Sequence, residues 1–417
     1  MTTAPSPLPL SVLISPHTTF HPSDNDTIDC MRAWSVRMHP RITHTFASGT
    51  QSLHPASPLF EKPFAIDTTM WIASCTKLLT AISVLQCVEK GLLNLDADLA
   101  DVLTEFNEIQ ILTGFDDNEK PVYKKPESKI TLRTLLSHSS GFGYAGFDPR
   151  LKKEVDYRGG KIDITGELLE HILVPLLYEP GRSWSYGVGL DWAGLAIERV
   201  TGQSLSAYME TNIINPLGMT STSFKLQSRQ DILAARSDMS LRLPDGSLIP
   251  SPTRYFPENS KDDFGGAGLF SCAQDYIKVL IDLLQDNSKL LSAASKEELF
   301  KQQLSTESKA ALNFVLYGDY EGNTNGEVGM LFSGGLPTGT DVGYSVGGLL
   351  VDGANGAGPN RRSKDALSWS GLPNLHWMVD RERGVALFYG SQLLPPGDIK
   401  TAETFAKFEE SIYKGEL

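Results

Sequence analysis

Ser74 and Lys77 stand three residues apart at the start of a predicted helix, in the tetrad Ser74-Cys75-Thr76-Lys77. Residues i and i+3 share one face of a helix, so the lysine amine can approach the serine hydroxyl. A hydroxyl is a weak nucleophile near neutral pH and needs such a base beside it. The helix N-terminus adds free N–H groups and a dipole that favours developing negative charge. This spacing therefore indicates covalent catalysis by an activated serine.

Two other serine patterns compete with this one. A second tetrad of the same type, Ser411-Ile412-Tyr413-Lys414, ends a predicted helix instead of starting one, so we interpret it as surface. The stretch Gly343-Tyr344-Ser345-Val346-Gly347 fits the G-x-S-x-G elbow of α/β-hydrolases. Such an elbow leads into a helix and needs an aspartate and then a histidine well downstream, whereas only His376 follows, too close for that topology. We interpret the elbow pattern as incidental.

The elements that position Ser74 are predicted from hydrophobic periodicity. Apolar residues at helical spacing predict helices over Thr76–Leu93, Leu190–Val200, Leu205–Ile214 (stopping at Asn215-Pro216), Asp275–Leu284 and Ala402–Tyr413. Short β-like runs predict strands at Ser11–Ile14, Ile42–Ala47, Tyr344–Val351, Ala366–Trp369, Leu375–Val379 and Val385–Tyr389. We expect a sheet domain built from residues 1–100 and 226–417, with a mostly helical domain of residues 101–225 inserted between them. Such a boundary leaves a cleft where small molecules commonly bind.

Composition excludes several classes of partner. The chain has 417 residues and a formal net charge of −13, without a long basic run, which disfavours nucleic acid and anionic membrane surfaces. The four cysteines form no C-x-x-C pair, and no carboxylate or cysteine accompanies His17, His21, His39 and His44 at ligand spacing. We therefore predict neither a disulfide framework nor a metal site. Met1 to Pro16 does not read as a signal peptide and no segment is long enough to span a bilayer, so we predict a cytoplasmic location.

From about Met70 to Tyr389 the chain resembles the family of class C serine β-lactamases, related esterases and penicillin-binding proteins. Four phrases appear in the family's order and at its usual separations: Trp71-Ile72-Ala73-Ser74-Cys75-Thr76-Lys77, Ile130-Thr131-Leu132-Arg133-Thr134-Leu135-Leu136-Ser137-His138-Ser139-Ser140-Gly141, Pro180-Gly181-Arg182-Ser183-Trp184-Ser185-Tyr186 and Asn215-Pro216-Leu217-Gly218-Met219-Thr220. The resemblance implies an α/β (α+β) fold of the β-lactamase/transpeptidase type. In that fold an antiparallel sheet flanked by helices carries an inserted, mostly helical domain.

The resemblance also implies roles for individual residues. The family's Tyr-x-Asn motif has its counterpart in Tyr186-Gly187-Val188, so Tyr186 is expected to share proton transfer with Lys77, and Val188 stands where the family has asparagine. A core tyrosine with a satisfied hydroxyl is the alternative. The implied oxyanion hole consists of the backbone N–H groups of Ser74 and Leu372. Tyr144 is a further candidate for substrate binding.

The family's third motif, Lys-Thr-Gly, is replaced here by Trp369-Ser370-Gly371. The lysine and threonine that hold a β-lactam carboxylate in the family thus become Trp369 and Ser370. A neutral, apolar ester or thioester fits such a site better than a penicillin does. Trp369 could also be a core aromatic on a buried strand, which is compatible with lining the pocket.

Further phrases resemble the lovastatin acyltransferase group, fungal transesterases of polyketide biosynthesis; they are Thr76-Lys77-Leu78-Leu79-Thr80, Gly114-Phe115-Asp116-Asp117, Leu190-Asp191-Trp192-Ala193-Gly194, Phe224-Lys225-Leu226-Gln227 and Pro373-Asn374. This resemblance implies an acyl-enzyme on Ser74, formed from a thioester carried by an acyl carrier protein or CoA. A hydroxyl of a small-molecule acceptor then attacks it, with no metal or organic cofactor. A hydrolase of the same family and a non-catalytic binding protein on the same fold are the alternatives. Before about Ala65 the match is poor.

Overall fold

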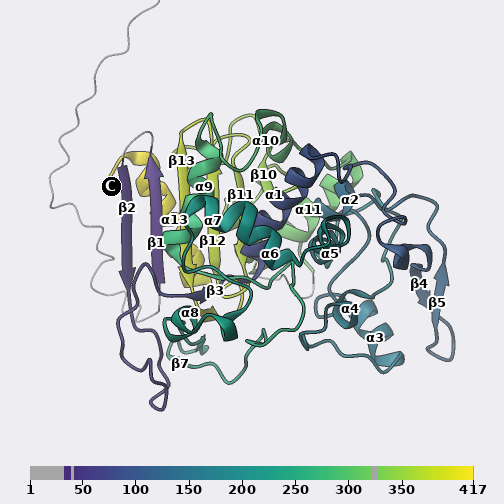
Figure 1. The fold of residues 1–417 in the computed structure, drawn as a ribbon, viewed down its shortest axis with the longest axis horizontal. Coiled ribbons are helices and arrows are strands. Elements are labelled where there is room, and N and C mark those ends of the chain that lie inside the picture. The colour runs from purple at the N-terminus through teal and green to yellow at the C-terminus, as the bar shows by residue number, and fades with distance from the viewer. Residues whose placement is uncertain (1–31, 39–41, 321–322, 324–326, 417) are drawn as a thin grey trace, which may run out of the picture.

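The centre of the molecule is a seven-stranded antiparallel sheet in the order β2-β1-β13-β12-β11-β10-β9, so its strands come from both ends of the chain (Figure 1). The computed structural model describes residues 32–38, 42–320, 323 and 327–416. The strands of this sheet are β1 Arg32–Met38, β2 Ile42–Ser48, β9 Val342–Tyr344, β10 Leu349–Val351, β11 Leu367–Gly371, β12 Leu375–Asp380 and β13 Val385–Ser391. The predicted fold class is confirmed. The domain limits at residues 100 and 225 stay a prediction, and the predicted strand Ser11–Ile14 lies outside the described residues.

Helices and three smaller sheets surround the central sheet (Figure 1). The small sheets pair β3 Met70–Trp71 with β8 Phe270–Ser271, β4 Ile111–Phe115 with β5 Pro121–Lys124, and β14 Leu393–Leu394 with β6 Ser240–Arg242 and β7 Leu248–Pro250. The helices are α1 Thr76–Glu89, α2 Leu132–Leu136, α3 Pro149–Tyr157, α4 Leu168–Ile172, α5 Gly189–Thr201, α6 Leu205–Met209, α7 Asn215–Leu217, α8 Gln230–Ala234, α9 Ala273–Leu284, α10 Ala293–Leu299, α11 Thr306–Tyr317, α12 Glu327–Ser333 and α13 Ile399–Lys414. None of the helices described combines the length and apolar character that a membrane crossing requires.

Strand β13 shows why helices must cover both faces of the sheet. Every residue of β13 is buried, and side chains of a strand alternate between the two faces. Phe388 belongs to the main core and packs against Tyr276 of α9, with ring centroids 4.7 Å apart. On the opposite face a second apolar cluster joins β12 and β13 to α13; it consists of Met378, Val385, Leu387, Tyr389, Phe405, Phe408 and Ile412.

Helix α1 runs through the middle of the protein and is buried from Thr76 to Cys87. A helix that is enclosed on all sides must satisfy its polar side chains internally. Thr80 Oγ1 donates to the carbonyl of Gly265 at 2.7 Å, and Gln86 Nε2 donates to that of Leu290 at 3.0 Å. The helix ends at Glu89, earlier than predicted, because the chain turns into the left-handed region at Gly91 (φ 69°).

The prediction that the helix from Leu205 stops at Pro216 is wrong. After α6 the chain forms a π-helical turn, Glu210–Ile214, and continues as α7 to Leu217 before Gly218 ends it in the left-handed conformation (φ 64°). Proline lacks an N–H donor but is tolerated in the first turn of a helix. The π-helical turn makes Pro216 part of a new first turn, so the helix can continue past it.

The prediction of a single strand over Tyr344–Val351 is also wrong. The segment forms β9 and β10, joined by a tight turn at residues 345–348. Ser345 Oγ accepts hydrogen bonds from the N–H groups of Gly347 and Gly348 at 2.9 and 3.1 Å. The two glycines interrupt the apolar run and allow this turn.

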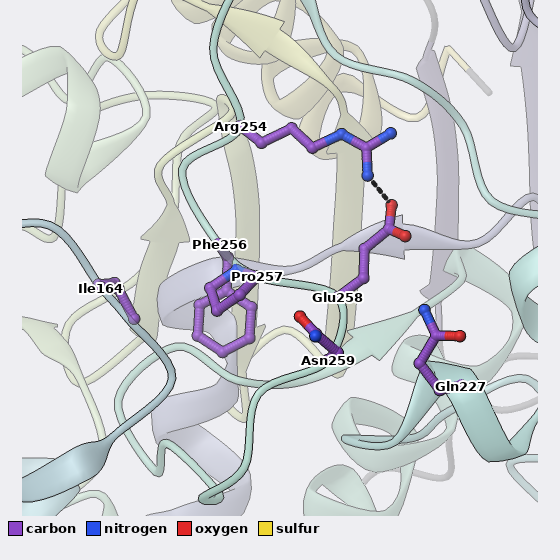
Figure 2. A pocket seen from close by; sticks show the side chains of 7 residues that line it. All are labelled: Ile164, Gln227, Arg254, Phe256, Pro257, Glu258 and Asn259. Carbon is purple, nitrogen blue, oxygen red and sulfur yellow. Dashed lines mark hydrogen bonds and ion pairs between the residues drawn. The ribbon is translucent and has the colours of Figure 1, made fainter.

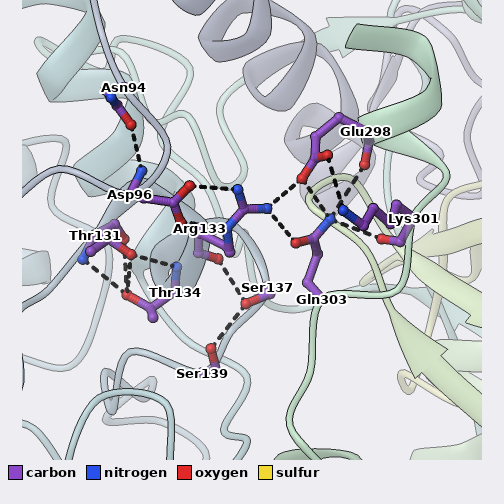
Figure 3. Close-up of polar contacts among 10 residues, drawn as sticks. All are labelled: Asn94, Asp96, Thr131, Arg133, Thr134, Ser137, Ser139, Glu298, Lys301 and Gln303. Carbon is purple, nitrogen blue, oxygen red and sulfur yellow. Dashed lines mark hydrogen bonds and ion pairs between the residues drawn. The ribbon is translucent and has the colours of Figure 1, made fainter. Parts of the chain in front are cut away.

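Arg133 of α2 joins separate parts of the helical region (Figure 3). Its guanidinium binds both carboxylate oxygens of Asp96, at 2.6 and 2.7 Å, and contacts Glu298 of α10 and Gln303. Bidentate pairs of this kind fix geometry as well as adding energy. Arg133 therefore holds α10 and the segment before α2 against each other.

Glu409 of α13 is a fully buried carboxylate paired with Arg362 and Arg361. Burial alone would raise its pKa, but the charge and hydrogen bonds of Arg362, and then those of Arg361, outweigh it and lower the pKa from 4.5 to about 2. A carboxylate whose pKa is lowered by folding contributes its full stabilisation when the pH is above its pKa in the unfolded chain. That stabilisation is lost as the pH falls through its pKa in the folded protein.

We predict that Glu409→Gln lowers the free energy of unfolding near neutral pH by about 3 kcal/mol. It should also flatten the loss of stability as the pH falls from 4.5 toward 2. Urea unfolding at a series of pH values measures both effects. Glu410→Gln is the matched control, since Glu410 is a half-exposed neighbour paired with Lys414, and it should change little. A variant at Glu409 with the wild-type acid slope would contradict the prediction.

Candidate active site

Ser74 lies in a short 3-10 turn, Ala73–Cys75, between β3 and α1. Ala73 takes φ 45°, a left-handed conformation that costs an L-residue roughly 1 kcal/mol and must be imposed by its surroundings. The short strand β3, Met70–Trp71, precedes this turn and has hydrogen-bonding partners on both of its edges. Trp71 pairs with Phe270 of β8, while the amide side chain of Gln392 binds the N–H and C=O of Trp71 at 3.1 and 3.0 Å. The position of Ser74 is therefore fixed by the backbone that leads into it.

Ser74 Oγ lies within hydrogen-bond distance of both predicted partners. Lys77 Nζ donates to it at 3.2 Å and the Tyr186 hydroxyl donates to it at 2.5 Å. Lys77 Nζ also lies 4.7 Å from the centre of the Tyr186 ring. Ser74 is half-buried, whereas Lys77 and Tyr186 are only 2% and 9% exposed. The arrangement places two proton-handling groups on one hydroxyl.

Lys77 has two further acceptors, the Tyr144 hydroxyl at 3.1 Å and the Gly266 carbonyl at 2.7 Å. With Ser74 Oγ these match the three N–H donors of an ammonium group. Behind them lies Asp191 of α5, which is 1% exposed and accepts a hydrogen bond from Gly266 N–H at 2.8 Å. Burial raises the pKa of Asp191, and the charge of Lys77 opposes that rise. Sequence reasoning missed Asp191, although an isolated carboxylate in the apolar run of α5 was a usable signal.

Trp369 stands beside the hydroxyl of Tyr186. Its indole N–H donates to the tyrosine oxygen at 3.4 Å, and its ring stacks on Phe332 of α12 at 4.8 Å between centroids. Other aromatic rings enclose Tyr186; they belong to His138, Tyr144, Phe147 and Trp184. The sequence did not indicate Phe332, because α12 is distant in the chain and only the fold brings it to β11.

The end of β11 meets the turn that carries Ser74. A Cβ atom at Gly371 would lie 2.6 Å from the carbonyl oxygen of Ile72, so only glycine permits this approach. Leu372, which is half-buried, is the next residue along. Ser370 and Val188 are 2% and 1% exposed, so both side chains lie in the protein interior.

Ser345 and Ser411, the serines of the two competing patterns, form local hydrogen bonds away from Lys77 and Tyr186. Ser345 is 0% exposed and its oxygen is bound within its own turn. The interpretation of Ser411 as surface is wrong, because it is 5% exposed and donates to the carbonyl of Phe408 at 2.9 Å. It lies on the inner face of α13, where the helix packs against the sheet.

A cavity of about 650 Å³ lies near the segment that leads to Ser74 (Figure 2); its lining residues are Ile164, Gln227, Arg254, Phe256, Pro257, Glu258 and Asn259. The ring of Phe256 stacks on Trp71 at 5.7 Å between centroids. The Arg254 guanidinium contacts the Glu258 carboxylate above this ring (Figure 2). The volume is in the range of cavities that hold small organic molecules.

Comparison with known proteins identifies the chain's relatives. The family model described as Beta-lactamase matches residues 49–409. The chain is 35% identical to the ML-236A carboxylate methylbutanoyltransferase of Penicillium citrinum, covering 90% of this chain and 88% of the relative. It is also 35% identical to a lovastatin esterase of Penicillium rubens, and the match covers 85% of this chain and 87% of the relative. A monacolin J acid methylbutanoyltransferase of Aspergillus terreus is 34% identical, covering 84% and 83%.

Solved structures agree with the sequence relatives. The unliganded simvastatin synthase of Aspergillus terreus superposes with a TM-score of 0.83 at 31% identity, covering 92% of this chain and 94% of that one. EstCE1, a hydrolase with promiscuous acyltransferase activity, shares the fold with a TM-score of 0.68 at 19% identity, covering 91% and 93%. The chain therefore belongs to the β-lactamase family, and its relatives there include fungal acyltransferases.

Proposed function

We propose that this enzyme transfers an acyl group from a thioester or ester donor, through an acyl-enzyme on Ser74, to a hydroxyl of a small natural product. The observation that carries the proposal is the contact of Ser74 Oγ with both Lys77 Nζ and the Tyr186 hydroxyl, at 3.2 and 2.5 Å. Relatives named for transfer to monacolin J acid and to ML-236A carboxylate support an acceptor of polyketide type. An acyl carrier protein or CoA thioester is the proposed donor.

The reaction has two half-reactions that use the same groups. In the first, Ser74 Oγ bonds to the acyl carbon while its proton passes to the Tyr186–Lys77 pair. The bond from carbon to the leaving sulfur or oxygen then breaks, and the leaving group takes that proton. In the second, the acceptor hydroxyl gives its proton to the pair and its oxygen bonds to the acyl carbon. The bond to Ser74 Oγ breaks, and Oγ recovers the proton.

Two backbone N–H groups, those of Ser74 and Leu372, are proposed to hold the oxyanion of each intermediate. The close approach of Gly371 to Ile72 supports this, because it brings the residue before Leu372 against the turn of Ser74. Trp369 supplies a neutral indole N–H to the Tyr186 oxygen, which favours a developing phenolate without attracting a substrate carboxylate. The cavity lined by Phe256, whose ring stacks on Trp71, is the proposed place for the acceptor.

Hydrolysis is the second candidate function, with water as acceptor in place of the alcohol. The 35% identity to a lovastatin esterase favours it specifically. The retained set of Ser74, Lys77 and Tyr186 argues against a non-catalytic binding protein, since binding alone has no need of this hydrogen-bonded arrangement.

The first prediction is covalent acylation of Ser74. Wild-type protein mixed with the butyryl thioester of N-acetylcysteamine should gain the mass of one butyryl group in intact-mass spectrometry. Ser74→Ala should gain none, and its thioester turnover should fall by at least about a thousandfold. Ser345→Ala is the control and should acylate like the wild type, since Ser345 is buried in its own turn. An adduct that persists in Ser74→Ala but disappears in Ser345→Ala would overturn the assignment.

The second prediction separates transferase from hydrolase. If transfer is the function, adding an apolar alcohol should speed loss of the butyryl adduct in proportion to alcohol concentration, and ester product should exceed free butyrate. Chromatographic quantification of both products measures the partition. An adduct whose loss is insensitive to every alcohol, with butyrate as the product, would establish hydrolysis instead.

The third prediction concerns Trp369. Trp369→Phe keeps an aromatic ring but removes the N–H beside the Tyr186 oxygen, so we expect the acylation rate to fall about tenfold. Trp377→Phe is the matched control, because it is the cross-strand partner on β12 and its indole N–H has no partner in the described part of the chain. Stopped-flow thioester cleavage compares the two. Equal rates for Trp369→Phe and wild type would exclude the proposed contribution.

A further inference from the structure

We infer that Asp191 is a positioning residue for the proposed acyl transfer, holding Lys77 in place through Gly266 and Tyr144 and providing the negative charge that offsets its ammonium form. This inference rests on the proposed function of Ser74 and Lys77. It assigns a role to a buried carboxylate that the two half-reactions do not use directly. Asp191 acts through other groups, since it contacts the Gly266 turn and not the serine.

The first connection runs through the turn at Gly266. Asp191 Oδ1 accepts the Gly266 N–H at 2.8 Å, and the carbonyl of the same residue accepts from Lys77 Nζ at 2.7 Å. A Cβ atom at Gly266 would lie 2.4 Å from Asp191 Oδ2, so glycine is required for the carboxylate to sit this close. The backbone of Gly266 therefore links the Asp191 carboxylate to the Lys77 amine and fixes their relative positions.

The second connection runs through Tyr144. Lys77 Nζ donates to its hydroxyl at 3.1 Å, and the Asp191 carboxylate lies near enough for its charge to act on that hydroxyl. Burial raises the pKa of Tyr144 well above its ordinary value, and the charge of Asp191 raises it further. The phenol therefore stays protonated while its oxygen accepts from the lysine.

Charge balance gives the third reason. Lys77 is 2% exposed, and an ammonium buried to this degree requires a counter-charge. The titratable groups around Lys77 and Asp191 are Cys75, His138, Tyr144, His171 and Tyr186. Burial lowers the pKa of both histidines and raises that of the Cys75 thiol, so these three are uncharged near neutral pH. Asp191 is the carboxylate that lies among these groups, and its negative charge can balance the positive charge of the lysine.

The test compares pH–rate profiles of acylation by butyryl-N-acetylcysteamine in wild type and Asp191→Asn. Asparagine keeps an acceptor for Gly266 N–H but removes the charge. Removing this negative charge disfavours a positive charge on the general base beside it, so the limb of the profile that reports deprotonation of that base should move to lower pH. The maximal rate should fall roughly tenfold, with little change in KM for the thioester.

Asp282→Asn is the matched control. Asp282 is a buried aspartate of α9, 3% exposed, and it accepts a hydrogen bond from the backbone N–H of Lys289 at 2.8 Å. No described hydrogen bond or ion pair joins it to Lys77. This variant should keep the wild-type profile. An unshifted profile in Asp191→Asn, whether at full rate or uniformly lowered, would overturn the inference, because a purely structural role lowers rate without moving the limb.

If Asp191→Asn does not fold, Tyr144→Phe tests the second connection, since it removes the hydroxyl that Lys77 contacts and on which the charge of Asp191 acts. A shift of the same limb to lower pH supports the inference and an unshifted limb overturns it. Failure of the proposed function is a separate outcome, because wild-type protein would then form no Ser74 adduct under any condition in the series.

Discussion

A buried lysine imposes the constraint on which the rest of the site depends. Amine N–H groups withdrawn from water must find acceptors within the protein. The acceptors of Lys77 come from three separated segments: the turn before α1, the loop that follows α2 and the glycine turn before β8. These segments meet because α1 packs against α5, while the turn Ala73–Cys75 before it packs against β11 and β12. The reacting geometry is thus a product of the whole fold and of no single motif.

In the proposed mechanism, strand β11 changes which substrates Ser74 can accept. A lysine at the position of Trp369 would place a cation where a substrate carboxylate could bind. The indole instead donates a neutral hydrogen bond to Tyr186 and packs flat on Phe332. Aromatic rings in such stacked pairs gain energy beyond their buried area, so the wall is rigid as well as apolar. One strand can therefore redirect substrate choice while Ser74 and Lys77 keep their arrangement.

The sequence predicted correctly those helices whose limits are set by apolar spacing and by glycine within the segment itself. The helix predicted over Leu190–Val200 is α5 almost to the residue, because its apolar spacing and the glycine stop at Gly202 are local properties. Strand β1 was not predicted, although Trp34, Val36 and Met38 alternate with polar residues as in a half-buried strand, and its pairing with β13 comes from the far end of the chain. The continuation of the helix past Pro216 needed a π-helical turn that no composition signal reports.

The site divides in the same way. The three-residue spacing of Ser74 and Lys77 was readable because a helix fixes it, and Tyr186 was indicated by the order of family phrases. Asp191 and Phe332 were missed, since each enters the site through tertiary contacts between distant elements. Asp191 stands in one of the phrases that carry the resemblance, Leu190-Asp191-Trp192-Ala193-Gly194, but the resemblance assigned it no role, because it lies beyond the Tyr-x-Asn motif in a helix that otherwise serves the core.

The surroundings of Ser74 also bear on which acceptor completes the reaction. Tyr186 contacts Phe332 edge-on, with centroids 4.9 Å apart, and the stacked ring of Trp369 completes an apolar wall. Such a wall offers water few hydrogen-bond partners, whereas an alcohol with an apolar body gains about 25 cal/mol for each Å² that it buries. In the proposed mechanism, the Tyr186–Lys77 pair can take a proton from either acceptor. Under that mechanism, selection between alcohol and water rests on binding beside the acyl-enzyme and not on the proton-transfer groups themselves.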